Sequence, residues 1–124
     1  MPGEGGELTE LKDGGAFRLV LVTAASEEEA ASIARALVEE GLAACVNIVP
    51  RVRSIYRWKG AVEDEAESLL LIKTAAERLE ALTERVLALH SYDVPEVIAL
   101  SLDRGAAGYL DWLAESCGAP PEGA

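Results

Sequence analysis

Cysteine and histidine are the residues of this chain that could bind a metal ion most specifically. Cys45 lies in the small apolar segment AACVNI, and His90, the single histidine, opens the segment HSYDVPE, which also carries Glu96. A thiolate is a soft ligand for copper or zinc, and imidazole and carboxylate groups can complete such a site. The same residues have ordinary roles, because free cysteine is often buried and a cation complements the C-terminal dipole of a helix. The residues alone leave a metal site and a packing role both open.

Lys73 could take part in a second kind of site. It lies near the end of the apolar run LLLIKT, where an ammonium group must either pair with a carboxylate or face an anionic ligand. Glu65, Asp93 and Glu96 are its candidate partners. A structural ion pair and an anion site are both compatible with this position.

Composition and motifs exclude several function classes. The 124 residues carry a formal net charge of -11, which argues against sequence-independent binding of nucleic acid. The two cysteines lack a paired spacing, and no apolar run approaches the length of a membrane span. We therefore expect an unexported cytoplasmic protein that binds neither nucleic acid nor membranes. We also expect that it is not an enzyme, because it lacks the GxSxG, HExxH and glycine-rich phosphate-binding patterns.

One long strand must position most of these residues. It runs from Ala43 to Gly60, and Pro50 in its middle predicts an edge strand that bends, because proline is tolerated only at sheet edges or bulges. Past the proline, alternate side chains share a face. One face carries Val52, Ser54, Tyr56 and Trp58, and the other carries Arg51, Arg53, Ile55 and Arg57. A three-residue loop at 59–61 would place Arg57 opposite Glu63 and Arg53 opposite Glu67.

The remaining patterns predict the order βαββαβ. Apolar runs at 17–23, 62–74 and 97–102 indicate further strands, and helical spacing indicates helices over 27–40 and 79–89. With right-handed crossovers, this order gives an α+β, ferredoxin-like two-layer sandwich with a four-stranded antiparallel sheet. We expect a single domain over residues 16–117, ending in a short helix around 109–113. Residues 1–15 are expected to form a disordered acidic and Gly-rich tail, and residues 118–124 a loose one.

Both helices of this fold lie on one face of the sheet, so the other face has no cover within the chain. An open face beside an overlong hairpin predicts a closed homo-oligomer in which the hairpin contacts a neighbour. The predicted interface residues are Arg53, Ile55, Tyr56 and Trp58.

Three ordered segments, AACVNIVPRVRSIYRWKG, ESLLLIKT and HSYDVPEVIAL, resemble the CutA family of divalent-cation tolerance proteins. The resemblance covers about residues 17–113. It implies a cytoplasmic ferredoxin-like homotrimer, similar to the PII signalling proteins and linked to tolerance of copper and other divalent cations. Ser91 stands where the family more often has proline, and Asp93 replaces a more usual glutamate.

The resemblance also implies site residues, and two functions follow from them. The implied metal ligands are Cys45, His90 and Glu96, and the implied cleft residues are Lys73, Glu65, Trp58 and Tyr92. In the first function, the trimer binds Cu²⁺ or another divalent cation, which it does not need for folding. In the second, a PII-like signalling or scaffold trimer binds a small anionic effector around Lys73 in clefts between subunits.

Overall fold

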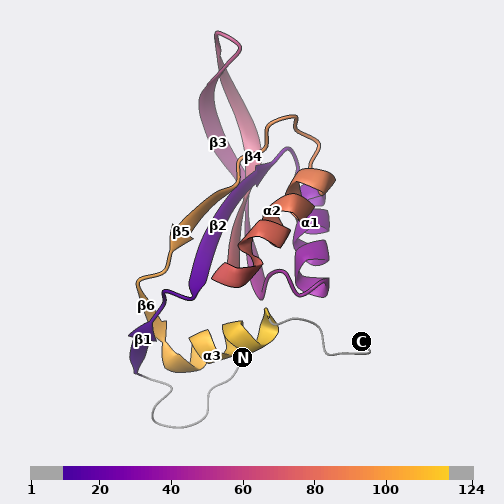
Figure 1. Ribbon diagram of the computed structural model, residues 1–124. Coiled ribbons are helices and arrows are strands. Elements are labelled where there is room, and N and C mark those ends of the chain that lie inside the picture. The colour runs from indigo at the N-terminus through magenta and orange to yellow at the C-terminus, as the bar shows by residue number, and fades with distance from the viewer. Residues whose placement is uncertain (1–9, 118–124) are drawn as a thin grey trace.

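The computed structural model describes residues 10–117. Their elements follow the chain in this order: β1 (Leu11–Asp13), β2 (Phe17–Ala24), α1 (Glu27–Glu39), β3 (Cys45–Trp58), β4 (Ala61–Ala75), the 3-10 turn η2 (Ala76–Arg78), α2 (Leu79–Leu89), β5 (Ile98–Ser101), β6 (Arg104–Ala106) and α3 (Ala107–Ser116). Helices α1 and α2 lie side by side on one face of the sheet, and the β3–β4 hairpin projects beyond both (Figure 1). No helix within residues 10–117 is long and apolar enough to cross a membrane.

The main sheet has four antiparallel strands in the order β3-β4-β2-β5. The predicted ferredoxin-like α+β fold is therefore confirmed. β2 and β4 occupy the centre because their near-continuous apolar runs can be buried on both faces. The strand carrying Pro50 lies at an edge, as predicted.

The core lies between this sheet and the two helices. Ser26 caps α1 by accepting a hydrogen bond from the backbone nitrogen of Glu29 at 3.1 Å, and the apolar stripe of the helix then faces the sheet. The fully buried large side chains of this core are Val20, Val22, Ile33, Leu37, Leu70, Ile72, Leu82 and Val86. A second, smaller cluster fixes α3 beneath the end of the sheet, around Phe17, Leu110, Leu113 and Cys117.

The hairpin bends where proline interrupts the strand. The pairing register shifts between Val49 and Val52, and Arg51 takes a left-handed backbone conformation with φ 61°. Such a bulge leaves one strand with extra residues and increases its local twist. The hairpin therefore leaves the plane of the sheet and extends past the helices (Figure 1).

The predicted pairing across the hairpin is wrong by one residue. The turn has two residues, Lys59 at φ 50° and Gly60 at φ 82°, so Trp58 pairs with Ala61. A two-residue turn with both φ values positive matches the twist of its flanking strands. As a result Arg53 lies opposite Ala66, and Arg57 lies opposite Val62.

This register places the glutamates on the aromatic face instead of the arginine face. Tyr56 pairs with Glu63, Ser54 with Glu65 and Val52 with Glu67. Directly opposed residues point to the same side of a sheet. Arg53 instead forms a two-pronged ion pair with Asp64, at 2.9 and 2.6 Å.

The predicted tail at residues 1–15 is wrong in its last third. Residues 11–13 form β1, which pairs with β6 as a separate two-stranded sheet. The backbone nitrogen of Ala107 donates to the carbonyl of Glu10 at 2.7 Å, so this strand also holds the start of α3. Residues 1–9 and the predicted loose tail at 118–124 lie outside the described residues.

The sheet face opposite the helices is apolar and largely open. Its side chains alternate with the buried ones along each strand, and they include Leu21, Leu69, Leu71, Ile98 and Leu100. Ile98 is 51% exposed and Leu100 is 44% exposed. Apolar surface that stays exposed loses the stabilisation of roughly 25 cal/mol per Å² that its burial would provide.

Candidate functional site

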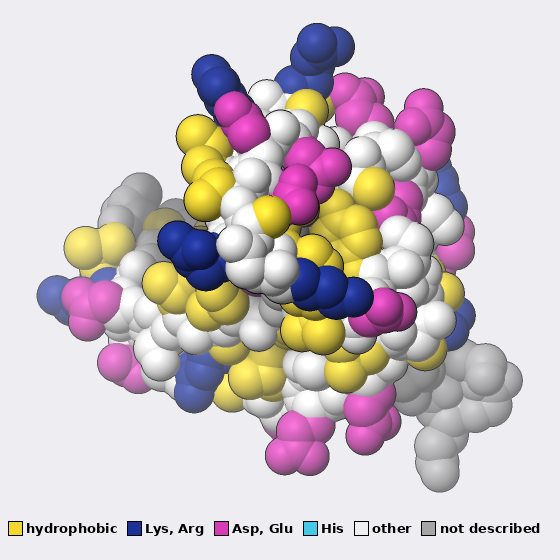
Figure 2. All heavy atoms as spheres, turned by 90° about the horizontal axis from the view of Figure 1, so that it is seen from above, with side chains coloured by type: hydrophobic (Ala, Val, Ile, Leu, Met, Phe, Trp, Pro, Cys, Tyr) yellow, Lys and Arg dark blue, Asp and Glu magenta, His cyan; other side chains and the backbone are white. Residues whose placement is uncertain are grey.

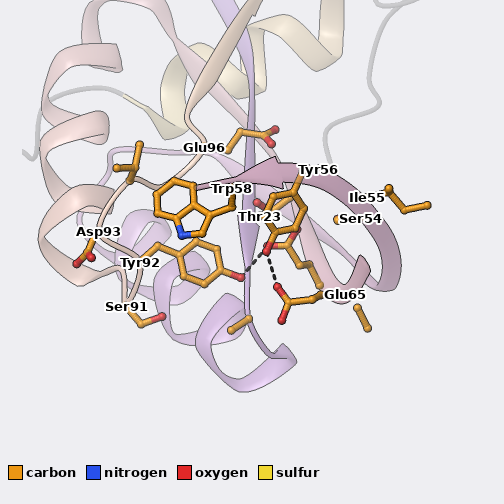
Figure 3. Close-up of a pocket in the computed structure, with 14 residues that line it drawn as sticks. Thr23, Ser54, Ile55, Tyr56, Trp58, Glu65, Ser91, Tyr92, Asp93 and Glu96 are labelled. Carbon is orange, nitrogen blue, oxygen red and sulfur yellow. Dashed lines mark hydrogen bonds between the residues drawn. The ribbon is translucent and has the colours of Figure 1, made fainter. Parts of the chain in front are cut away.

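A groove lies where the hairpin leaves the sheet, and its volume is about 800 Å³. The residues that line it come from the end of β2, from both strands of the hairpin and from the connector, residues 90–97 between α2 and β5. They are Thr23, Ala25, Ser54, Ile55, Tyr56, Trp58, Glu65, Ala66, Glu67, Ser91, Tyr92, Asp93, Val94 and Glu96. The sticks in Figure 3 show the rings of Trp58, Tyr56 and Tyr92 clustered at its centre, with Asp93 at its outer edge.

Two tyrosines bind the carboxylates of β4. The hydroxyl of Tyr92 donates to Oε2 of Glu67 at 2.7 Å, and the hydroxyl of Tyr56 donates to Oε1 of Glu65. The first bond joins the connector to the hairpin across the groove, and the second links the two strands of the hairpin (Figure 3). Glu67 is only 9% exposed and lies against the side chain of Tyr92.

Burial, hydrogen bonds and neighbouring carboxylates raise the pKa values of three acidic groups in the groove. Burial, and then the negative charge of Glu67, raise the pKa of Glu96. The hydrogen bond to Glu65, with burial and the neighbouring glutamates, raises the pKa of Tyr56 to about 12. Burial and the bond to Glu67 raise the pKa of Tyr92 further. Burial disfavours a charge of either sign, whereas the contributions of Glu65 and Glu67 show that a further negative charge is disfavoured here and that a cation would be attracted.

Glu29 at the start of α1 fixes the connector. Its Oε2 accepts from the backbone nitrogen of Ser91 at 2.8 Å, and its Oε1 accepts from the hydroxyl of Ser91 at 3.0 Å. Burial opposes the charged form of Glu29, but these bonds and a bond from the backbone nitrogen of Ala25 outweigh burial and lower its pKa. Ser91, which stands where the family more often has proline, therefore holds the connector in shape through its hydrogen bonds to Glu29.

His90 is placed to support the connector rather than to bind a ligand. Its side chain is fully buried, its Nε2 lies 2.7 Å from the carbonyl of Thr23, and its Nδ1 accepts from the backbone nitrogen of Tyr92 at 3.1 Å. A carbonyl only accepts and a backbone N–H only donates, so this is the neutral tautomer protonated at Nε2. Both ring nitrogens are engaged, which leaves no lone pair for a metal ion in this arrangement.

Cys45 and Lys73 lie away from the groove. They pair with each other across β3 and β4, while Glu67 lies six residues from Lys73 along β4, about 20 Å away at the usual rise of a strand. The ammonium group of Lys73 donates to Oδ1 of Asn47, so none of the predicted carboxylate partners binds it. The neighbouring thiol of Cys45 contributes, after burial, to the raised pKa of Tyr109 on α3.

The structure therefore divides the predicted site residues into three groups. Four of them, Trp58, Glu65, Tyr92 and Glu96, line the groove. Cys45 and Lys73 lie together at the other end of the same sheet face, and His90 lies beneath the connector. Within residues 10–117 no three His, Cys, Asp or Glu side chains are close enough to form a complete metal site.

The predicted interface residues also fall into two groups. Tyr56 and Trp58 line the groove, whereas the ion-paired Arg53 lies on the opposite face of the hairpin. Ile55 also borders the groove, but its side chain is 63% exposed and points away from the aromatic cluster (Figure 3). A neighbour covering one of these faces would leave the other exposed.

Sequence reasoning misses Glu67 and Glu29 as site residues. The expected three-residue loop is one residue too long, and it assigns Glu67 to the arginine face. Glu29 looks like a capping residue alone, and only the fold brings it beside Ser91. The Lys59–Gly60 turn could have indicated the position of Glu67, whereas no local pattern indicated the role of Glu29.

Fold and groove together define a class: a ferredoxin-like α+β protein whose projecting hairpin and connector enclose an acidic, aromatic groove. Residues 18–116 match the family described as CutA1 divalent ion tolerance protein. The chain belongs to this family of CutA divalent-cation tolerance proteins.

Relatives and solved structures agree with this assignment. The divalent-cation tolerance protein CutA of Thermus thermophilus is 57% identical over 100 residues, covering 81% of this chain and 97% of that protein. The chloroplastic CutA of Arabidopsis thaliana is 51% identical over 98 residues, but the chain spans only 54% of its length. The solved structure of a divalent cation tolerance protein from Thermus thermophilus matches with a TM-score of 0.80 at 56% identity, covering 82% of this chain and 99% of that one. CutA from Synechococcus elongatus matches with a TM-score of 0.86 at 40% identity, covering 90% and 99% respectively.

Proposed function

We propose that this protein is a cytoplasmic, non-catalytic homotrimer that binds divalent cations, Cu²⁺ among them, and so contributes to cation tolerance. The observation that carries the cation-binding part is the composition of the groove. Glu65, Glu67 and Glu96 line it, and among the described residues no Lys or Arg does. A site with this charge attracts cations and repels anions.

The carboxylates suit a partly hydrated ion. Glu67 and Glu96 are close enough for the charge of one to raise the pKa of the other. A divalent ion bound by one or two carboxylates commonly keeps several of its water molecules. Such binding needs no complete cage of protein ligands, which agrees with the lack of a three-ligand cluster within residues 10–117.

The proposed assembly follows from the open sheet face. A stripe of leucine and isoleucine side chains remains exposed there in a single chain, with the hairpin projecting beyond it (Figure 1). Packing three such faces together would bury the stripe and bring each hairpin against a neighbour. Two unpaired cysteines, Cys45 and Cys117, support a reducing compartment. The raised pKa values of Tyr56 and Tyr92 support a binding role, because neither phenol is prepared to act as a base.

An anionic effector has less support. The lysine expected to recognise it lies outside the groove and binds Asn47. Figure 2 looks down on the hairpin and shows basic, acidic and apolar side chains all reaching the surface at this end of the molecule. Selectivity must therefore come from the side chains that line the groove, and those are acidic.

Calorimetric titration of the assembled protein with Cu²⁺ and Zn²⁺ tests the cation site. A Glu67→Gln/Glu96→Gln double variant should weaken binding at least tenfold, or about 1.4 kcal/mol, because it removes two anionic ligands. Glu80→Gln/Glu84→Gln changes the net charge equally on the exposed surface of α2 and should have little effect. Cys45→Ala should also leave the carboxylate site intact. Equal affinities in the two double variants would refute a site in the groove.

A further inference from the structure

Within residues 10–117, the carboxylate of Glu67 is buried without a positive charge beside it. Its side chain is nine-tenths buried, and the hydrogen bond that the structure gives it comes from the neutral hydroxyl of Tyr92. No ion pair to Glu67 forms within the described part of the chain. Burying an ionised carboxylate without a counter-charge is costly, so the site favours any cation that can reach it.

Aromatic rings form the other half of the groove. Trp58, Tyr56 and Tyr92 cluster beside the carboxylates, and Glu65 and Glu96 lie on opposite sides of this cluster (Figure 3). Ring faces offer nothing to a hard metal ion that prefers oxygen ligands. They do stabilise organic ammonium groups, through the negative potential of the ring face and through contact with attached methylene groups.

The size of the groove also favours an organic ligand over a single metal ion. The groove has a volume of about 800 Å³, which is within the range of sites that bind small organic molecules. A single metal ion would contact only a small part of it. The anionic groups are also spread, because Glu65 comes from the projecting part of β4, Glu67 from nearer the sheet, and Glu96 from the connector.

We propose that the groove binds a linear organic polyammonium ion, with ammonium groups at Glu67, Glu96 and Glu65 and the intervening methylene segments against Trp58 and Tyr92. This inference rests on the proposed cation selectivity of the groove and names a second class of ligand for it. One ammonium group would supply the counter-charge that Glu67 lacks. The Nζ atom of the adjacent Lys59 lies 5.7 Å from the centre of the Trp58 ring, so this ring is already within reach of a cation.

Calorimetry with spermidine on the full-length protein is the primary test. Mg²⁺ serves as a hard dication, and 1,8-octanediol as an uncharged chain of similar length. Trp58→Leu should weaken spermidine binding about tenfold, whereas Trp58→Phe, which keeps a ring, should recover part of the loss. Glu67→Gln should weaken it at least as much, and octanediol should not bind. Light scattering on each variant shows whether its oligomeric state is retained.

The outcomes separate this inference from the proposed function. Spermidine binding that depends on Trp58, together with Mg²⁺ and Cu²⁺ binding that does not, supports both proposals. Cu²⁺ binding without spermidine binding overturns the inference and leaves the proposed function in place. Spermidine binding without Cu²⁺ binding supports the inference and refutes the metal site.

Two further results would also overturn the inference. Spermidine affinity that is equal in the parent protein and in Trp58→Leu would reflect general attraction to a chain with a net charge of -11. Absence of spermidine binding, with the fluorescence of Trp58 in a Trp112→Phe background already shielded from a neutral quencher in the free protein, would mean that a neighbouring subunit fills the groove.

Discussion

Glu67, which is buried, and Glu29, which is half-buried, show how two glutamates perform different tasks. Glu67 carries its charge into the groove without a cation beside it, whereas Glu29 has its charge satisfied by the connector. Hydrogen bonds to the ionised form lower the pKa of Glu29 despite its burial. The first glutamate is therefore suited to bind a ligand, and the second to hold Ser91 and the adjoining Tyr92 in position.

Replacement of Glu29 by glutamine should destabilise the protein in a pH-dependent way. Because the pKa of Glu29 is lower in the folded state, its contribution is present above its ordinary pKa and is lost as pH falls through the folded value. The free energy of unfolding should fall by about 1.5 kcal/mol at pH 7 and by less at pH 3. Urea unfolding at the two pH values measures this. An equal loss at both would assign the effect to packing instead of charge.

The β3–β4 hairpin is the element that creates the groove. The bulge after Val49 carries the strand out of the sheet plane, and the two-residue turn sets which side chains face the connector. A one-residue change in this register would move the glutamates of β4 relative to Tyr56 and Trp58. The conformation of the turn is therefore linked directly to the composition of the site.

Gly60→Ala should destabilise the hairpin by about 1 kcal/mol, because a side chain at positive φ is strained. Gly60 has φ 82°, and a Cβ atom there would meet nothing within 4 Å, so the cost is purely conformational. Gly60→Asn should cost less, since asparagine tolerates this region. Denaturant unfolding of both variants tests the difference. Equal stability of Gly60→Ala and the parent protein would show that the turn does not hold residue 60 at positive φ.

At the scale of the whole molecule, the open sheet face and the groove are parts of one surface. The side chains of Leu69 and Leu71 share their face of β4 with Glu65 and Glu67, by the alternation of the strand. The apolar part of this surface is suited to contact other subunits, and the acidic part to bind a ligand. Assembly through the apolar part would bring neighbouring chains close to the acidic part.

Leu100→Asp should convert the proposed trimer to monomers, because it places a charge in the apolar stripe. Leu87→Asp, at a side chain of similar exposure on α2, should leave the mass unchanged. Size-exclusion chromatography with light scattering measures both. A Tyr56→Asp/Trp58→Asp double variant tests the hairpin contact separately. If Leu100→Asp has the mass of the parent protein, the open face is not the assembly surface.

Local patterns were sufficient to predict the main architecture. Periodicity of apolar residues predicted four strands and two helices in the right order, Pro50 predicted the bent edge, and three segments indicated the CutA family. These properties depend on neighbours along the chain, so they can be read from the sequence. β1 was missed because a three-residue strand of LKD has almost no pattern, and its pairing with β6 depends on residues about ninety positions away.

Only the tertiary structure decided which of the chemically capable residues lie together. In the sequence, Cys45, His90, Lys73 and Glu96 stand out by residue type. The fold, however, places Cys45 and Lys73 at one end of the sheet and engages both ring nitrogens of His90 in hydrogen bonds. Glu67 joined the site through a turn one residue shorter than expected. The physical reason is that a side chain's type sets what it can bind, whereas register, strand alternation and burial set what it can reach.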